Sequence, residues 1–98
     1  MNVLFRPEAR IEALDAQSWY ENRSSGLGLR FAISLRTSIQ SALRNPFAFQ
    51  VIEGDCRRVI LRHFPYSVIY RPDANGILIV AIFHHHRLPG TWRNRVDD

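Results

Sequence analysis

The strongest constraint on the fold is the apolar run Ile-Leu-Ile-Val-Ala-Ile-Phe at residues 77–83, which no polar residue interrupts. A run this short cannot cross a bilayer, and its lack of alternation is typical of a strand buried on both faces. Asn75-Gly76 directly precedes it, and this pair favours a tight hairpin turn. Residues 67–71 are therefore expected to return alongside a central strand that the rest of the chain covers.

Two helices are predicted before these strands. Residues 2–6 form a short first strand in this interpretation, and Pro7 suits a first helical turn because its missing N–H would be unpaired there. The first helix carries its small apolar residues and one aromatic ring on one stripe: Ala9, Ala13, Ala16 and Tyr20. Residues 22–26 break it. The second helix has its own stripe, formed by Phe31, Leu35 and Ile39, and should end at Asn45-Pro46, since the residue before proline resists helical geometry.

The remaining segments predict strands. Residues 49–53 form one, and residues 57–64 form another, in which Val59, Leu61 and His63 share a face. The resulting order is β-α-α-β-β-β-β, with helices and strands in separate runs, which indicates an α+β fold. We expect a helical hairpin packed on a small antiparallel sheet. The 98 residues leave no room for a second domain, so residues 1–98 should form one.

The charge balance points to an anionic partner. All thirteen basic residues are arginines, and the net charge is +4. Arginine grips phosphate or carboxylate through two bonds, whereas lysine acts as a solvated point charge. The alternative is that the missing lysine reflects genomic base composition and that the arginines only keep the chain soluble. Net charge alone does not decide between the two.

The start of the chain lacks a basic segment followed by a long apolar run, and no segment is long enough to span a bilayer. We therefore expect a cytoplasmic protein with no membrane partner. The single cysteine, Cys56, has no partner for an internal disulfide and no neighbours at metal-ligand spacing, so we interpret it as an ordinary strand thiol.

Histidines follow the apolar run at residues 84–86, which makes the edge of the sheet a candidate site. His84 and His86 lie two residues apart, so both can reach one ion. Zinc usually needs a third ligand, which His63 or Asp55 would have to supply. Histidines at the end of a strand are more often solvated or bonded to a loop. The prediction is therefore no metal and no cofactor.

Three local patterns occur in a characteristic order. The first is Trp19-Tyr20-Glu21 followed by Gly-Leu-Gly-Leu-Arg-Phe at residues 26–31, and the second is Phe-Pro-Tyr-Ser-Val-Ile-Tyr at residues 64–70. The third has the form H-x-x-R-x-P-x-x-W-x-x-R and comprises His84, Arg87, Pro89, Trp92 and Arg95. Through these patterns the chain resembles the ParE branch of the ParE/RelE superfamily of bacterial type II toxins over nearly its whole length. It departs at Leu88, where the family commonly has an acidic or amide residue.

The resemblance implies a small toxin that a cognate ParD-like antitoxin neutralises. ParE members poison DNA gyrase, whereas the RelE branch cuts messenger RNA on the ribosome with the same fold, so the fold does not identify the target. We expect a gyrase inhibitor that acts by binding and is not an enzyme, because the chain lacks a lysine of the kind often used as acid or base in the RelE branch. A toxin that has lost activity and only binds its partners is a third interpretation.

The alternative function is a ribosome-dependent endonuclease, with the ribosome and messenger RNA as partners. Histidine can serve as acid or base near neutral pH, and arginines suit the charge of the scissile phosphate. The catalytic residues in this alternative are His84, His86, Arg58, Arg62 and Arg87.

For a toxin that acts by binding, the predicted target-binding residues are arginines and one tryptophan, the types most enriched at binding hot spots. They are Arg57, Arg58, Arg62, Arg87, Trp92, Arg93 and Arg95. In the opposing interpretation, Trp92 folds back as a lid on the core and the arginines pair with carboxylates of the chain such as Glu53.

Antitoxin binding is predicted at different residues. If one stripe of the first helix faces the sheet, Ile11, Leu14 and Trp19 remain as apolar surface for an amphipathic partner helix. Alternatively, the second helix buries all three within the hairpin. An acidic antitoxin tail would also suit the arginine-rich sheet.

Overall fold

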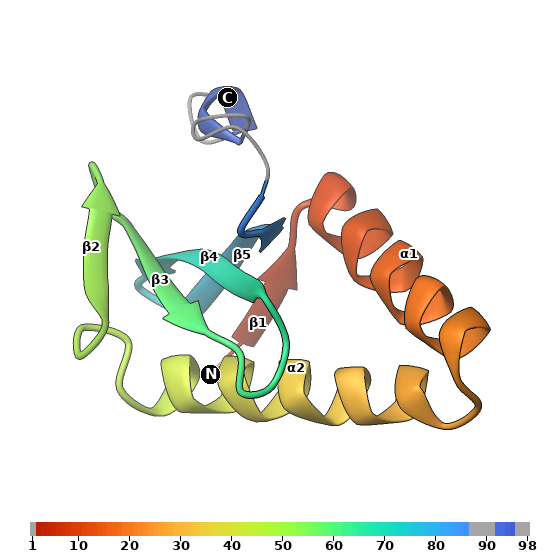
Figure 1. Ribbon diagram of the computed structural model, residues 1–98. Helices are drawn as coiled ribbons and strands as arrows, with labels where there is room; N and C mark the ends of the chain where they lie inside the picture. The colour runs from red at the N-terminus through yellow and green to blue at the C-terminus, as the bar shows by residue number, and fades with distance from the viewer. Residues whose placement is uncertain (1, 87–91, 96–98) are drawn as a thin grey trace.

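The computed structural model describes residues 2–86 and 92–95, and it has two helices on a five-stranded sheet (Figure 1). The elements in chain order are β1 (Asn2–Phe5), α1 (Pro7–Arg23), α2 (Leu27–Arg44), β2 (Gln50–Glu53), β3 (Cys56–Ile60), β4 (Tyr66–Asp73), β5 (Gly76–His84) and the 3-10 helix η1 (Arg93–Arg95). The α+β class and the element order predicted from the sequence are confirmed.

The sheet has the strand order β1-β5-β4-β3-β2. Strands β2 to β5 pair antiparallel, as predicted, but β1 joins β5 in parallel, with Phe5 opposite Ile79. A parallel pair requires a long crossover connection, and here the chain between β1 and β5 includes both helices and three strands. β5 is therefore an interior strand, which explains its uninterrupted apolar run.

The helical hairpin closes tightly at a motif that the sequence analysis singled out. Glu21 on α1 accepts hydrogen bonds from the backbone N–H groups of Gly26, at 3.1 Å, and Gly28, at 3.0 Å. A Cβ at Gly28 would lie 2.8 Å from the carbonyl oxygen of Gln17, so only glycine allows α2 to approach α1 this closely. Glu21, Gly26 and Gly28 thus hold the start of α2 close against α1.

Two apolar clusters occupy the two faces of the sheet. On the helix face, the predicted stripes of α1 and α2 pack on the sheet, including fully buried Ala9, Phe31 and Ala42. On the other face, Cys56, Ile69 and Ala81 form a smaller cluster that Trp92 covers. Figure 1 shows the segment that contains η1 beyond the end of β5, away from α2.

The prediction of a strand over residues 57–64 was wrong at its carboxyl end, because β3 ends at Ile60. His63 has a φ of 70°, which an extended strand does not allow, and Pro65 has no N–H with which to continue the ladder. His63 therefore lies in the connection between β3 and β4.

The predicted β4–β5 hairpin forms, although its turn differs from the expected one. Asp73 pairs with Gly76, so Ala74 and Asn75 are the loop residues, and neither has a positive φ. Gly76 instead stands beside β1 with a φ of 146°, and a Cβ there would lie 1.9 Å from the carbonyl oxygen of Asn2. Glycine is needed at this position for the parallel pairing of β1 with β5.

Candidate functional site

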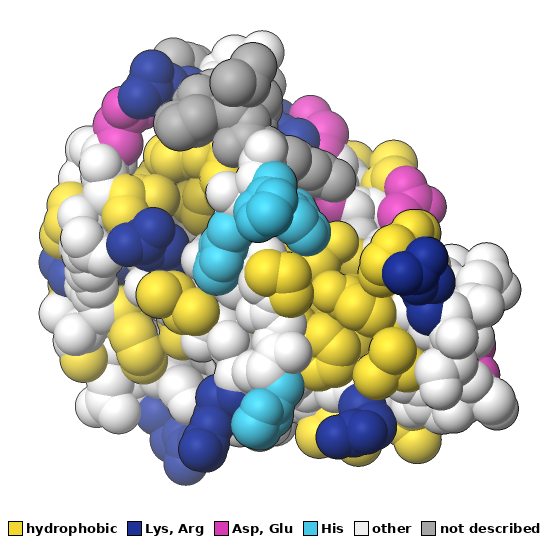
Figure 2. Space-filling view, in the orientation of Figure 1, with side chains coloured by type: hydrophobic (Ala, Val, Ile, Leu, Met, Phe, Trp, Pro, Cys, Tyr) yellow, Lys and Arg dark blue, Asp and Glu magenta, His cyan; other side chains and the backbone are white. Residues whose placement is uncertain are grey.

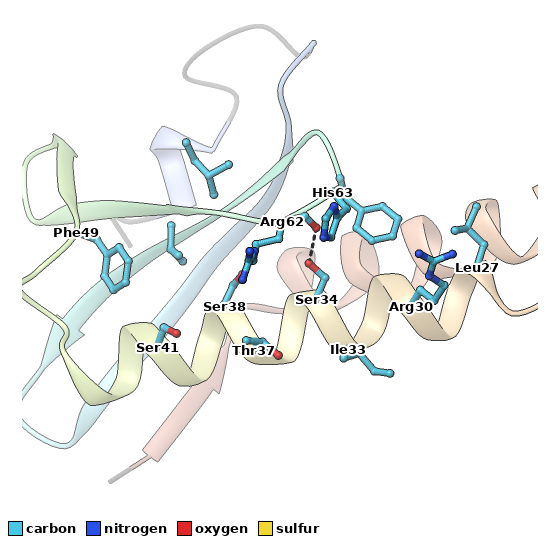
Figure 3. Close-up of a pocket in the computed structure, with 13 residues that line it drawn as sticks. Leu27, Arg30, Ile33, Ser34, Thr37, Ser38, Ser41, Phe49, Arg62 and His63 are labelled. Carbon is cyan, nitrogen blue, oxygen red and sulfur yellow. Dashed lines mark hydrogen bonds between the residues drawn. The ribbon is translucent and has the colours of Figure 1, made fainter.

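A groove of about 690 Å³ runs between α2 and the end of β3, and we call it the α2 groove (Figure 3). Hydroxyl side chains on one face of α2 form its wall, and Figure 3 shows Arg62 and His63 above them. Ser34 donates a hydrogen bond of 2.8 Å to the carbonyl oxygen of Arg62 and so ties the wall to the β3–β4 connection. The lining residues are Leu27, Arg30, Ile33, Ser34, Thr37, Ser38, Ser41, Phe49, Val59, Ile60, Arg62, His63 and Phe64.

The α2 groove combines apolar surface with positive charge. Ile33 and Ile60 are 56% and 55% exposed. Arg30 and Arg62 supply two guanidinium groups, and the described residues that line the groove include no carboxylate. This surface is suited to a segment that carries both apolar and acidic side chains.

A second hollow, of about 570 Å³, lies between α1, the β3–β4 connection and the end of β5, and we call it the aromatic cavity. Figure 2 shows histidine side chains beside a hydrophobic area in this part of the surface. Its lining residues are Glu12, Asp15, Ala16, Trp19, Tyr20, Pro65, Tyr66, His84 and His86. Residues from three parts of the chain thus converge on one cavity.

His84 and His86, the histidines predicted as a site, do lie together. Their ring centroids are 5.1 Å apart, and the backbone N–H of His86 donates a 3.0 Å hydrogen bond to Nδ1 of His84. His85 points elsewhere, with its Nε2 2.9 Å from the hydroxyl of Ser67. The side chain of His84 therefore bonds to the loop that follows β5, as in the interpretation that a histidine at the end of a strand bonds to a loop. The described residues contain no group of three or more His, Cys, Asp or Glu side chains arranged to hold a metal ion.

The other members of the alternative catalytic set do not join these histidines. Arg62 lines the α2 groove, and Arg58 donates a 2.6 Å hydrogen bond to the side chain of Gln50 on β2. Arg58 pairs with Ile69 in the sheet, on the face opposite the helices. Arg87 lies outside the described residues.

The remaining predicted target-binding residues make contacts within the fold. Arg57 donates hydrogen bonds to the carbonyl oxygens of Phe47 and Phe49, at 3.1 and 2.8 Å, and so holds the connection from α2 to β2. Arg93 pairs with Glu53 at 2.8 Å on the surface. Trp92 is only 5% exposed, which agrees with the interpretation of this residue as a lid on the core.

Arg95 forms a largely buried ion pair that the sequence analysis missed. Its guanidinium contacts both carboxylate oxygens of Glu12 on α1, at 2.9 and 3.0 Å, and the carbonyl oxygen of Val80 at 3.1 Å. The hydrogen bond to Glu12 raises the pKa of Arg95. The same carboxylate accepts a 3.1 Å hydrogen bond from the N–H of Ile82. The ion pair thus provides hydrogen-bond partners for the carbonyl oxygen of Val80 and the N–H of Ile82, two backbone groups of β5 that lie beyond the end of β1.

The predicted antitoxin-binding residues are exposed apolar side chains on α1, so the alternative in which α2 buries them is wrong. Ile11 and Leu14 are each 58% exposed, and Trp19 is 53% exposed. Trp19 differs from the other two because it also lines the aromatic cavity.

The remaining shifts in pKa have burial as their main cause. Burial raises the pKa of the Cys56 thiol, as expected for an ordinary strand cysteine, and burial also raises the pKa values of Tyr20 and Tyr70. Tyr70 donates a 2.8 Å hydrogen bond to the carbonyl oxygen of Pro46. No helix among the described residues is long and apolar enough to cross a membrane.

Comparison with known proteins agrees with this architecture. The family described as the ParE toxin of the type II toxin–antitoxin system parDE matches residues 3–89. A solved structure, described as the chromosomal ParDE TA system from P. aeruginosa, has the same fold, with a TM-score of 0.71 at 17% identity over 86% of this chain and 95% of that chain. No curated protein matches the chain. Because the family match spans most of the sequence, the chain belongs to the ParE toxin family of type II toxin–antitoxin systems.

Proposed function

We propose that this ParE-family toxin inhibits DNA gyrase by binding it, and that a cognate ParD-like antitoxin neutralises the toxin. The family match over residues 3–89 carries the proposal. The separation of the alternative catalytic residues adds support, since a ribonuclease needs its acid, its base and its cations around one phosphate. His84 and His86 line one cavity, whereas Arg62 lines another.

Two surfaces support an antitoxin that wraps the toxin. The outer side of α1 offers Ile11 and Leu14 to the apolar face of a partner helix. The α2 groove offers apolar side chains flanked by Arg30 and Arg62, which suit an acidic segment of the same partner. Two separate contacts on one chain raise the effective concentration of the second once the first is made.

For the gyrase contact, the strongest candidates are arginines whose side chains lie at the surface. Arg62 and Arg93 are exposed, and the ion pair that Arg93 makes among the described residues is with an exposed carboxylate, which a partner can displace at little cost. Arg57 and Arg95 are held by contacts within the fold, so their direct participation would first require breaking those contacts.

The experiment measures two activities of the purified toxin: inhibition of supercoiling by gyrase, and cleavage of messenger RNA on translating ribosomes. His84→Ala removes the central histidine of the alternative catalytic set, and Arg62→Gln removes an exposed cation. We expect supercoiling to be inhibited by the wild type and by His84→Ala, and less strongly by Arg62→Gln. Ribosome-dependent RNA cleavage that His84→Ala abolishes, or a wild type inactive in both assays, would overturn the proposal. Circular dichroism melting establishes that both variants are folded.

A further inference from the structure

Apart from Trp19, which is also a predicted antitoxin contact, the residues that line the aromatic cavity have no part in the proposed gyrase or antitoxin contacts. Its rings form a continuous edge-to-face series that begins on α1 and ends after β5. Successive centroids lie 5.0 Å apart from Trp19 to Tyr20, 6.2 Å from Tyr20 to Tyr66, 4.9 Å from Tyr66 to His84 and 5.1 Å from His84 to His86. The interplanar angles in this series run from 65° to 87°. Such an arrangement turns ring faces in several directions around one space.

Charge in the cavity is negative on the α1 side. Glu12 and Asp15 line it, and its described lining residues include no arginine. Glu12 is already engaged by Arg95 and by the N–H of Ile82. Asp15 is exposed, and no hydrogen bond or ion pair involves it among the described residues. The cavity therefore offers one carboxylate that is available to a ligand, beside a set of aromatic rings.

The ring of Trp19 already contacts one guanidinium group. The Arg23 side chain, which does not line the cavity, lies over the indole with its Cζ 4.7 Å from the ring centroid. Trp19 is nevertheless 53% exposed, so indole surface is left for a second contact. Aromatic rings next to a carboxylate attract a cation both by the cation–π interaction and by Coulomb attraction to the carboxylate.

We propose that the aromatic cavity binds an arginine side chain presented by a protein partner, independently of gyrase inhibition. A guanidinium group fits better than an ammonium group because it is planar and weakly hydrated, stacks on aromatic rings and can donate two hydrogen bonds to Asp15. Nucleic acid is disfavoured, although its bases would stack on the same rings, because its phosphates would approach the carboxylate of Asp15.

Tryptophan fluorescence tests the proposal directly, since Trp19 lines the cavity and Trp92 is buried on the other face of the sheet. The probe is the peptide acetyl-Gly-Arg-Gly-amide, and its control carries citrulline, which has nearly the same shape without the charge. We expect saturable quenching by the arginine peptide and about tenfold weaker binding of the citrulline peptide. Asp15→Asn should weaken binding of the arginine peptide several-fold.

The matched control is Glu8→Gln, which removes a carboxylate from the same helix outside the cavity and should leave binding unchanged. Equal affinity for the two peptides would overturn the proposal, as would an Asp15→Asn variant that binds like the wild type or a lack of saturable quenching. Tighter binding of an oligothymidylate than of the arginine peptide would also overturn it and favour nucleic acid.

Discussion

At the scale of single residues, Gly76 is the described glycine at which an added Cβ would make the closest contact. Its φ of 146° and the 1.9 Å approach of an added Cβ to the Asn2 carbonyl oxygen act together. Gly76→Ala should therefore lower the free energy of unfolding by about 2 kcal/mol or more, because β1 must move away from β5. Chemical denaturation measures this loss.

Gly54 provides the matched control, because it also has a positive φ, of 54°, but an added Cβ meets nothing within 4 Å. Gly54→Ala should cost about 1 kcal/mol, from backbone strain alone. Equal losses for the two variants would contradict the role of close packing at Gly76.

The thiol of Cys56 should be inert in the folded protein. It is 2% exposed, and burial raises its pKa, so both access and the thiolate fraction are reduced. Alkylation by iodoacetamide at about pH 8.5 should proceed only through unfolding and should accelerate in denaturant. Because the folded-state pKa lies above that of the unfolded chain, this group's contribution to stability is fully present below the unfolded pKa and declines as the pH rises past it. Rapid alkylation under native conditions would show that the thiol is accessible.

At the scale of elements, the Arg95–Glu12 pair fastens η1 to α1 and to the uncovered part of β5. Its side chains are 15% and 13% exposed. Arg95→Gln leaves a largely buried carboxylate without its cation and should reduce the free energy of unfolding by about 2 to 4 kcal/mol. Thermal denaturation of the variant tests this value.

The surface pair of Arg93 and Glu53 is the internal control, because its side chains are 58% and 43% exposed. Arg93→Gln should change stability by less than about 1 kcal/mol. If both arginine variants melt like the wild type, η1 does not depend on the buried pair.

The sequence predicted elements whose signals are local. The stripes on α1 and α2 follow from the 3.6-residue period, and β5 follows from its apolar run. The parallel pairing of β1 and the contact between Arg95 and Glu12 connect distant segments, so no local pattern predicts them. The α2 groove forms because β3 lies over α2. The spacing of Ser34, Ser38 and Ser41 places them on one face of α2, but the sequence does not show that this face borders a groove.

At the scale of the whole molecule, the three candidate surfaces lie on different parts of the fold. The α2 groove is apolar and basic, the aromatic cavity is apolar and acidic, and the outer side of α1 is apolar. A partner that wraps the molecule can therefore be recognised by different chemistry at each surface. Mutations of the exposed side chains at these surfaces, such as Leu14 and Arg62, should separate binding from folding, since these two residues belong to neither cluster of the core.

Leu14→Ser tests this separation for the proposed antitoxin contact. Leu14 is 58% exposed, so the change should leave the free energy of unfolding within about 0.5 kcal/mol of the wild type. Loss of an apolar contact with a partner helix should weaken binding of the cognate ParD-like antitoxin by about tenfold, as measured by calorimetry. Leu29→Ser is the control, because Leu29 is 62% exposed on α2 and lines neither the α2 groove nor the aromatic cavity. If the two serine variants bind the antitoxin equally, α1 is not the face that the partner helix covers, and the α2 groove becomes the leading candidate for the principal contact.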